Sequence, residues 1–233
     1  MSEILSPSTP RLRALLFDFD GLIVDTESPS FESWNEIYRE HGQELDLQQW
    51  ADVISNRESG FDALTNLQTL LGGARLDPVA LNARRNARKN ELTDGTQLLP
   101  GIREYIVGAQ QLGLLLGIAS GSSRPWVLRH LDRLEIGDMW QCIRSRDDVE
   151  RSKPHPETYL SLLDCLGIGA SEAIALEDSP NGVASAQAAG IYCVAIPNRL
   201  TRSLDLSRAD VVVESLPDFP LTDLLRAASR RPS

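Results

Sequence analysis

The segment Ala14-Leu15-Leu16-Phe17-Asp18-Phe19-Asp20-Gly21 places two carboxylates at the end of an apolar run that is long enough for a buried strand. Residues two apart in an extended chain point to the same side, so Asp18 and Asp20 should project together from the end of this strand. Two like charges this close are unfavourable unless a cation lies between them. The segment therefore indicates a metal-dependent site, although an isolated Asp-x-Asp pair is also compatible with a solvated acidic turn.

Further apolar runs follow later in the chain, and helix-like segments separate them. These runs cover residues 114–119, 142–143, 173–176, 192–196 and 210–213. Strands separated by helices imply right-handed crossovers and a parallel sheet with helices on both faces. Continuous rather than alternating apolar runs are typical of strands buried on both sides. We therefore predict an α/β fold with a doubly wound parallel sheet, a Rossmann-like core.

The segment between residues 26 and 96 has a different character. Apolar and aromatic residues recur there at helical spacing in four successive stretches, and no strand pattern interrupts them. We predict a small α-helical cap domain over residues 26–96, inserted into a catalytic core formed by residues 11–25 and 97–228. Trp34 and Trp50 should lie in the interior of the cap, and Asp25-Thr26 should form the hinge that leads into it.

Composition and charge restrict the class of partner. The 233 residues include 33 acidic and 23 basic ones, which gives a formal charge of −10. This balance disfavours nucleic acid, because phosphate backbones are bound by net basic surfaces. No apolar stretch approaches the roughly 20 residues of a membrane span, and residues 1–10 lack the apolar segment of a secretory signal. We expect a cytoplasmic monomer that binds neither nucleic acid nor a membrane.

The three cysteines, Cys142, Cys165 and Cys193, are widely spaced and lie among apolar neighbours. Their odd number and this setting favour buried free thiols in a reducing cytoplasm over disulfides or a metal site.

Polar clusters follow three of the predicted strands: Asp18/Asp20, residues 120–123 and Glu177/Asp178. In open parallel sheets the binding crevice lies outside the carboxyl ends of the strands, so these clusters should converge there, together with the loop 151–156. Phosphoryl transfer needs such a set: a carboxylate that attacks phosphorus, a proton donor, a hydroxyl and an ammonium on the phosphoryl oxygens, and acids that hold Mg²⁺.

At this point the chain strongly resembles the haloacid dehalogenase superfamily, and within it the β-phosphoglucomutase-like branch of phosphatases and phosphohexomutases with a helical cap. The resemblance covers about residues 13–197. Four motifs occur in the family's order: Asp18-Phe19-Asp20-Gly21, Ala119-Ser120-Gly121-Ser122, Ser152-Lys153-Pro154 and Glu177-Asp178-Ser179-Pro180-Asn181-Gly182. Each motif alone is weak evidence for the family. The four together, in this order and each after its expected strand or loop, are specific to it.

The resemblance implies catalytic roles for four residues. Asp18 corresponds to the nucleophile that forms an aspartyl-phosphate. Asp20 corresponds to the general acid/base, and its presence argues against dehalogenation because dehalogenase members lack this second acid. Ser120 and Lys153 would bind the phosphoryl group that is transferred.

The resemblance also implies a magnesium site and substrate contacts. Mg²⁺ would be held by Asp18, the backbone carbonyl of Asp20, Asp178 and Glu177, in the oxygen shell that this ion requires. The expected substrate-binding residues are Gly121, Asn181 and Arg57, the last of which resembles a cap arginine that grips the distal phosphate of a bisphosphate. A helix-end arginine exposed to solvent is the alternative for Arg57.

Other polar residues have two interpretations each. Ser122, Ser123 and Asn181 are expected to cap helices, with phosphate contact as the alternative. His155 is expected to shape the lysine loop rather than to approach the substrate. The basic cluster 84–89 is expected to be a solvated face, within which Lys89 is the residue best placed to reach the cleft, and Glu27 is a candidate to face the cleft.

The predicted function is Mg²⁺-dependent hydrolysis of a small phosphomonoester, such as a sugar phosphate, through an aspartyl-phosphate. A phosphohexomutase of the β-phosphoglucomutase type is the alternative. β-Phosphoglucomutase has a histidine five residues after the Asp-Thr that opens its cap, whereas Ser30 occupies that position here, which favours the phosphatase. A second alternative is a catalytically idle binding protein on the same scaffold, and retention of every chemical group argues against it.

Overall fold

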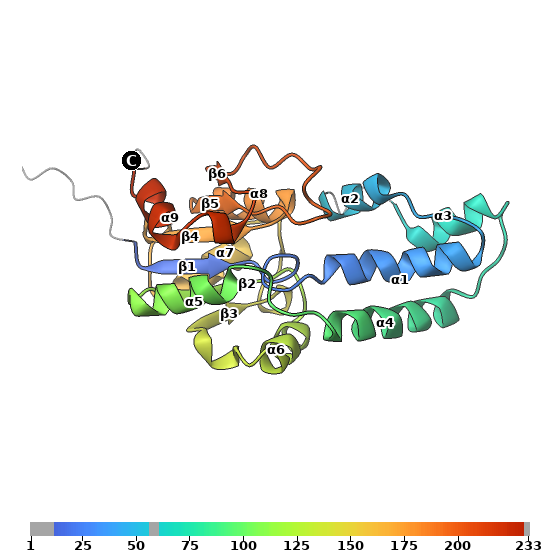
Figure 1. Cartoon of the computed structure of the whole chain (residues 1–233), viewed down its shortest axis with the longest axis horizontal. Coiled ribbons are helices and arrows are strands. Elements are labelled where there is room, and N and C mark those ends of the chain that lie inside the picture. The colour runs from blue at the N-terminus through green and yellow to red at the C-terminus, as the bar shows by residue number, and fades with distance from the viewer. Residues whose placement is uncertain (1–11, 56–60, 231–233) are drawn as a thin grey trace, which may run out of the picture.

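The computed structural model describes residues 12–55 and 61–230, and within them it forms one parallel sheet of six strands in the order β3-β2-β1-β4-β5-β6 (Figure 1). The strands are β1 (Ala14–Phe17), β2 (Leu115–Ala119), β3 (Cys142–Arg144), β4 (Ala173–Glu177), β5 (Tyr192–Ala195) and β6 (Val211–Val212). Because β1 pairs with both β2 and β4, the first strand of the chain is central. The predicted α/β fold with a doubly wound parallel sheet is confirmed.

Two layers of helices cover the sheet. Side chains of α5 (Ile102–Gln111), α6 (Arg124–Arg133) and α9 (Leu221–Ala228) share one apolar cluster with the sheet. Those of α7 (Glu157–Leu166) and α8 (Pro180–Ala188) form a second cluster on the opposite face. All four residues of β1 are buried, as the continuous apolar run predicted. Short 3₁₀ helices occupy Gly137–Met139, Arg146–Asp148, Ala170–Glu172 and Leu216–Asp218.

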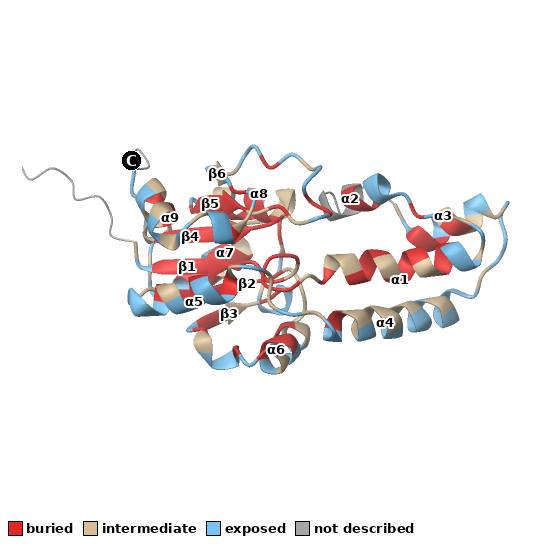
Figure 2. Ribbon diagram, in the orientation of Figure 1, coloured by how far each residue is buried: buried red, intermediate tan, exposed pale blue. Residues whose placement is uncertain are grey.

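In the described part of the chain, four helices lie between β1 and α5, and we call them the helical module: α1 (Glu27–Glu40), α2 (Leu47–Ser55), α3 (Ala63–Leu70) and α4 (Pro78–Asp94). The module extends from the edge of the sheet where β1 ends (Figure 1). It has an apolar cluster of its own, in which Trp34 and Trp50 are buried as predicted, and Leu200 of the sheet-forming part packs into the same cluster. Much of α1 is buried (Figure 2), and its residues Phe31, Trp34, Ile37 and Tyr38 belong to this apolar cluster.

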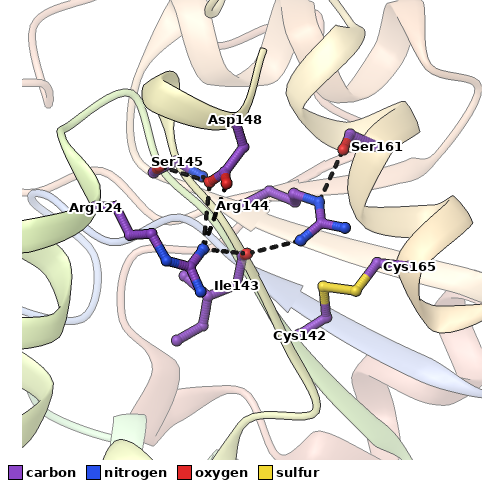
Figure 3. Close-up of a disulfide and its surroundings, with 8 residues drawn as sticks. All are labelled: Arg124, Cys142, Ile143, Arg144, Ser145, Asp148, Ser161 and Cys165. Atoms are coloured by element: carbon purple, nitrogen blue, oxygen red, sulfur yellow. Dashed lines mark hydrogen bonds and ion pairs between the residues drawn. A yellow bond between two sulfur atoms is a disulfide. The ribbon is translucent and has the colours of Figure 1, made fainter.

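Two of the three cysteines form a disulfide, so the prediction of three free thiols is wrong for Cys142 and Cys165 (Figure 3). Cys142 begins β3 and Cys165 lies near the end of α7, and the packing of this helix on the strand brings their Cα atoms to 6.4 Å. A hydrogen bond of 2.8 Å from Arg144 Nε to Ser161 Oγ joins the same two elements. Cys193 in β5 is free and buried, as predicted.

Within the described residues, no helix combines the length and the apolar character that crossing a membrane requires.

We predict that the denatured protein presents one reactive thiol without reductant and three with it, because only Cys193 is free. Reduction should lower the free energy of unfolding by about 3 kcal/mol, since the bond closes a loop of intermediate length. Thiol titration in denaturant and urea unfolding with and without reductant measure both effects. As a control, Cys165→Ser should present two thiols and unfold identically with and without reductant; three thiols in the unreduced wild type would contradict the disulfide.

Candidate active site

The carboxyl ends of β1, β2 and β4 meet at a cavity of about 280 Å³, at the edge of the sheet where ligands of open parallel sheets bind. Its lining combines two parts of the chain. The sheet-forming part contributes Asp18, Asp20, Gly121, Ser122, Lys153, Asp178, Ser179, Asn181 and Gly182, and the helical module contributes Glu27, Ser30 and Trp50. The predicted convergence of the strand ends is therefore present.

Three buried carboxylates gather on one side of this cavity. Phe17 pairs with Leu176 in the β1–β4 ladder, so Asp18 emerges beside Glu177 and Asp178. Each of the three acids offers a carboxylate oxygen, and these oxygens lie within 4.8 Å of one another. Such a set of hard oxygen donors suits a divalent cation such as Mg²⁺.

Lys153 bridges two of the three acids. Its Nζ donates to Asp18 Oδ1 at 2.6 Å and to Glu177 Oε1 at 2.5 Å, and all three side chains are buried. The hydroxyl of Tyr159 donates to the same Glu177 oxygen at 2.6 Å. One ammonium thus faces three carboxylates, which leaves the cluster short of positive charge.

The pKa values of these groups follow from their burial and from the charges around them. Burial raises the pKa of Asp18 to about 8; the charges of Glu177 and Asp20 add to the shift and Lys153 opposes it. Burial also raises the pKa of Asp178 well above its usual range, with Asp18 and Glu177 adding to the effect. Burial alone would lower the pKa of Lys153, but the carboxylates of Asp18 and Glu177 outweigh it and raise that pKa.

Two glycines let the backbone approach these acids. Gly21 has φ +86°, and a Cβ there would lie 2.3 Å from Asp178 Oδ2. A Cβ at Gly182, in the first turn of α8, would lie 1.7 Å from Glu177 Oε2. That buried oxygen has no hydrogen-bond partner within the described ranges. It therefore retains a lone pair for a cation.

Asn198 donates a hydrogen bond to the acid cluster and was not identified from the sequence as a site residue. Its Nδ2 donates to Asp178 Oδ2 at 2.7 Å and to the carbonyl oxygen of Gly21 at 3.1 Å. The residue follows β5 after Ile196 and Pro197. Applying the strand-end argument to β5 as well as to the other strands would have identified it.

The carboxylate of Asp20 lies apart from the three-acid cluster. Its Oδ1 accepts hydrogen bonds from Thr26 Oγ1 at 2.8 Å and from Trp126 Nε1 at 2.9 Å. Its Oδ2 accepts one from Ser120 Oγ at 3.2 Å. Trp126 was also missed, because one tryptophan at helical spacing in α6 has no signal that separates it from core packing.

The loop after β2 brings Ser120 to the site. Ser120 is fully buried, and its Oγ accepts from the backbone N–H of Ser122 at 2.9 Å. The prediction that Ser122 and Ser123 cap a helix is wrong: Ser123 precedes α6 without a side-chain cap, and Asp147 Oδ2 accepts from the backbone N–H of Arg124 instead.

The cap of α8 also differs from the prediction. Ser179, not Asn181, is the capping residue, and its hydroxyl accepts from the backbone N–H of Gly182 at 3.2 Å. Asn181 is thereby left in the first turn of the helix, where it lines the cavity. His155 is not among the lining residues, and its Nδ1 accepts from the backbone N–H of Glu157, as expected of a residue that shapes the loop.

The basic face of α4 is only partly solvated. Arg84 pairs with Glu40 at the surface, as predicted. Arg85, in contrast, donates to Ser30 Oγ, and Lys89 Nζ lies 4.5 Å from the centroid of the Trp126 ring. Burial lowers the pKa of Lys89, with the neighbouring Arg85 adding to the shift.

Glu27 lines the cavity from the helical module, as expected. Arg57 lies outside the described residues.

Comparison with known proteins identifies relatives along nearly the whole chain. The haloacid dehalogenase-like hydrolase family model matches residues 15–196. "Putative phosphatase YhcW" of Bacillus subtilis is 38% identical over 92% of this chain and 96% of its own length. Hexitol phosphatase B of Escherichia coli K12 is 30% identical over 94% and 99%. The crystal structure of CbbY from Rhodobacter sphaeroides in complex with phosphate has a TM-score of 0.72 at 26% identity, covering 91% of this chain and 99% of that one.

We predict that the protein without divalent cations loses stability as pH rises from 6.5 to 8. The raised pKa of Asp18 means that the folded state keeps a proton that the unfolded chain has released above pH 3.8. Stability then falls with pH up to about 8, by about 1.4 kcal/mol per pH unit for one proton. Below 6.5 the buried His130, whose pKa burial lowers, acts in the opposite direction.

Urea unfolding in a chelating buffer measures this slope. Asp18→Asn should flatten it, because the variant lacks the proton in question and relieves the repulsion on Asp178. A wild-type stability that rises between pH 6.5 and 8 would contradict the assignment of the raised pKa to these buried acids.

Proposed function

This chain belongs to the haloacid dehalogenase-like hydrolase family, and we propose that it is a phosphatase that hydrolyses a small phosphomonoester through an aspartyl-phosphate on Asp18. The observation that carries the proposal is the 2.6 Å hydrogen bond from Lys153 Nζ to Asp18 Oδ1 within the buried acid cluster. A carboxylate placed in this way can attack phosphorus while the ammonium neutralises phosphoryl oxygens. Both curated relatives carry the name phosphatase.

The proposed reaction has two halves. In the first, a carboxylate oxygen of Asp18 attacks phosphorus, the bond from phosphorus to the leaving oxygen breaks, and Asp20 gives that oxygen its proton. In the second, Asp20 takes a proton from water, and the water oxygen attacks phosphorus. The bond between phosphorus and Asp18 then breaks and inorganic phosphate is released. Asp20 is protonated again at the end, so protons balance over the cycle.

The phosphoryl oxygens have donors on several sides of the cavity. Lys153 supplies the charge, and the buried Ser120 directly precedes Gly121, which lines the cavity. Asn181 lines the cavity from the first turn of α8, where the partial positive charge of the helix N-terminus favours an anion.

The acid cluster fits Mg²⁺. Its donors are carboxylate oxygens, they outnumber the ammonium that pairs with them, and Glu177 Oε2 is buried without a hydrogen-bond partner in the described part of the chain. We infer that Asp18, Asp178, Glu177 and the backbone carbonyl of Asp20 would hold the ion. When bound, Mg²⁺ supplies positive charge that stabilises the phosphoryl oxygens.

The helical module lines part of the cavity, and we infer that it acts as a cap that excludes water from the phosphoryl group. It offers polar groups to the alcohol part of the substrate: the carboxylate of Glu27 and the hydroxyl of Ser30. Trp50 adds an indole Nε1 that is buried and unpaired in the ranges described. This polar lining, and the name of hexitol phosphatase B among the relatives, favour a sugar or polyol phosphate.

The surroundings of Ser30 favour hydrolysis over the mutase alternative. Ser30 occupies the position of the β-phosphoglucomutase histidine, and its buried hydroxyl accepts a hydrogen bond from Arg85. Unlike an imidazole, a serine hydroxyl does not take up and release a proton near neutral pH, so it cannot couple cap closure to proton transfer between sugar hydroxyls. Water is then the acceptor that the site leaves for the second half-reaction.

We predict that Asp18→Asn lowers kcat by about a thousandfold or more, because the amide cannot form the acyl phosphate. The measurement is phosphate release from a panel of sugar and polyol phosphates with Mg²⁺. Asp164→Asn is a matched control, since it makes the same change of charge at an exposed site on α7 and should keep wild-type activity. Full activity of Asp18→Asn would exclude the mechanism, and a wild type inactive on a broad panel would favour the idle binding protein.

We also predict that β-glucose 1-phosphate with a trace of glucose 1,6-bisphosphate yields inorganic phosphate rather than an isomer. The reason is that the Ser30 environment provides no second proton carrier. Phosphate release and glucose 6-phosphate formation are followed in the same reaction. Rapid formation of glucose 6-phosphate without phosphate release would identify a mutase instead.

A further inference from the structure

The carboxylate of Asp20 is held by donors from three separate parts of the chain. Thr26 directly precedes the helical module and Ser120 follows β2, so both belong to segments already placed at the site. Trp126 is different: it is the third residue of α6, it is not among the residues that line the cavity, and yet its Nε1 donates to Asp20 Oδ1 at 2.9 Å.

The indole of Trp126 is fixed by contacts from both parts of the molecule. From the helical module, Lys89 Nζ lies 4.5 Å from the ring centroid, which is a cation–π contact. From α6 itself, His130 packs edge-on at a centroid distance of 4.3 Å. Burial lowers the pKa of His130, with Arg133 and Arg129 adding to the shift, so a neutral imidazole lies against the ring. The direction of the indole N–H is therefore set by packing.

The three donors differ in which oxygen of Asp20 they allow to carry a proton. A hydroxyl, as in Thr26 or Ser120, rotates and both donates and accepts, so it tolerates a proton on either carboxylate oxygen. An indole N–H only donates, so it opposes a proton on the oxygen that it contacts. Because Trp126 contacts Oδ1, the transferable proton of Asp20 is confined to Oδ2, where Ser120 Oγ lies at 3.2 Å.

We propose that Trp126 is a positioning residue that fixes Oδ2 of Asp20 as the oxygen that donates the proton to the leaving group. This inference rests on the proposed phosphatase function. Lys89 extends the arrangement to the helical module, because its ammonium lies on the same ring. The alignment of Asp20 is then complete only when the module is docked on the sheet-forming part.

Two phosphate esters separate this role from a general effect on folding. The alkoxide of glucose 6-phosphate needs a proton as it leaves, whereas p-nitrophenyl phosphate releases a stable phenolate without one. The ratio kcat/KM reports on steps up to the departure of this group. Trp126→Phe keeps an aromatic face for Lys89 and removes the N–H together with part of the indole ring, a loss of ring volume that Trp140→Phe reproduces elsewhere in the core. It should lower kcat/KM for glucose 6-phosphate about tenfold or more, and change that for p-nitrophenyl phosphate by less than about twofold.

Two further variants complete the test. Trp140→Phe is the matched control, because Trp140 is a buried tryptophan that packs edge-on against Phe17 and has an unpaired Nε1 within the described residues. Trp140→Phe should leave kcat/KM for glucose 6-phosphate and for p-nitrophenyl phosphate at their wild-type values. Lys89→Gln should reproduce the selective loss in a smaller degree.

The outcomes that overturn the inference are distinct. Equal losses on both esters in Trp126→Phe, or no loss on either, would overturn the positioning role while the proposed function stands. A wild type inactive toward both esters would overturn the proposed function and this inference with it.

Discussion

The site depends on the ion pairs of Lys153, because its ammonium is hydrogen-bonded to the buried carboxylates of Asp18 and Glu177. Burying these charges is unfavourable unless each keeps partners, and Tyr159 and Lys153 together satisfy one oxygen of Glu177. Asp178 adds a third carboxylate that the single ammonium does not balance. The residual negative charge makes the cluster receptive to a cation. Burial, with the neighbouring carboxylates adding to it, raises the pKa values of Asp18 and Asp178.

The sheet topology explains why so much charge can gather there. With β1 central, the chain leaves three adjacent strands at one edge, and each delivers its first polar residue to the same place. The approach is close enough to exclude a Cβ at Gly21 and at Gly182. The acids are therefore enclosed by the backbone at these two glycines as well as held by hydrogen bonds.

The helical module is joined to this framework by more than its two connections. Leu200 of the sheet-forming part packs into the apolar cluster of the module, two residues after Asn198, which donates to Asp178. On the other side, Lys89 contacts Trp126, which donates to Asp20. The position of the module is thus linked through short chains of contacts to an acid of the cluster and to the proposed proton donor.

Most of the fold and the centre of the site could be predicted from the sequence, because a buried parallel strand and the polar residues at its end are encoded in a few consecutive residues. Asp18 was identified in this way, and so was its neighbourhood of acids. Trp126 and Asn198 were not, and neither was the bond between Cys142 and Cys165. These depend on how a helix or loop packs against an element distant in sequence. Local periodicity fixes which face of a helix is buried, whereas only the tertiary structure decides which partner a buried side chain meets.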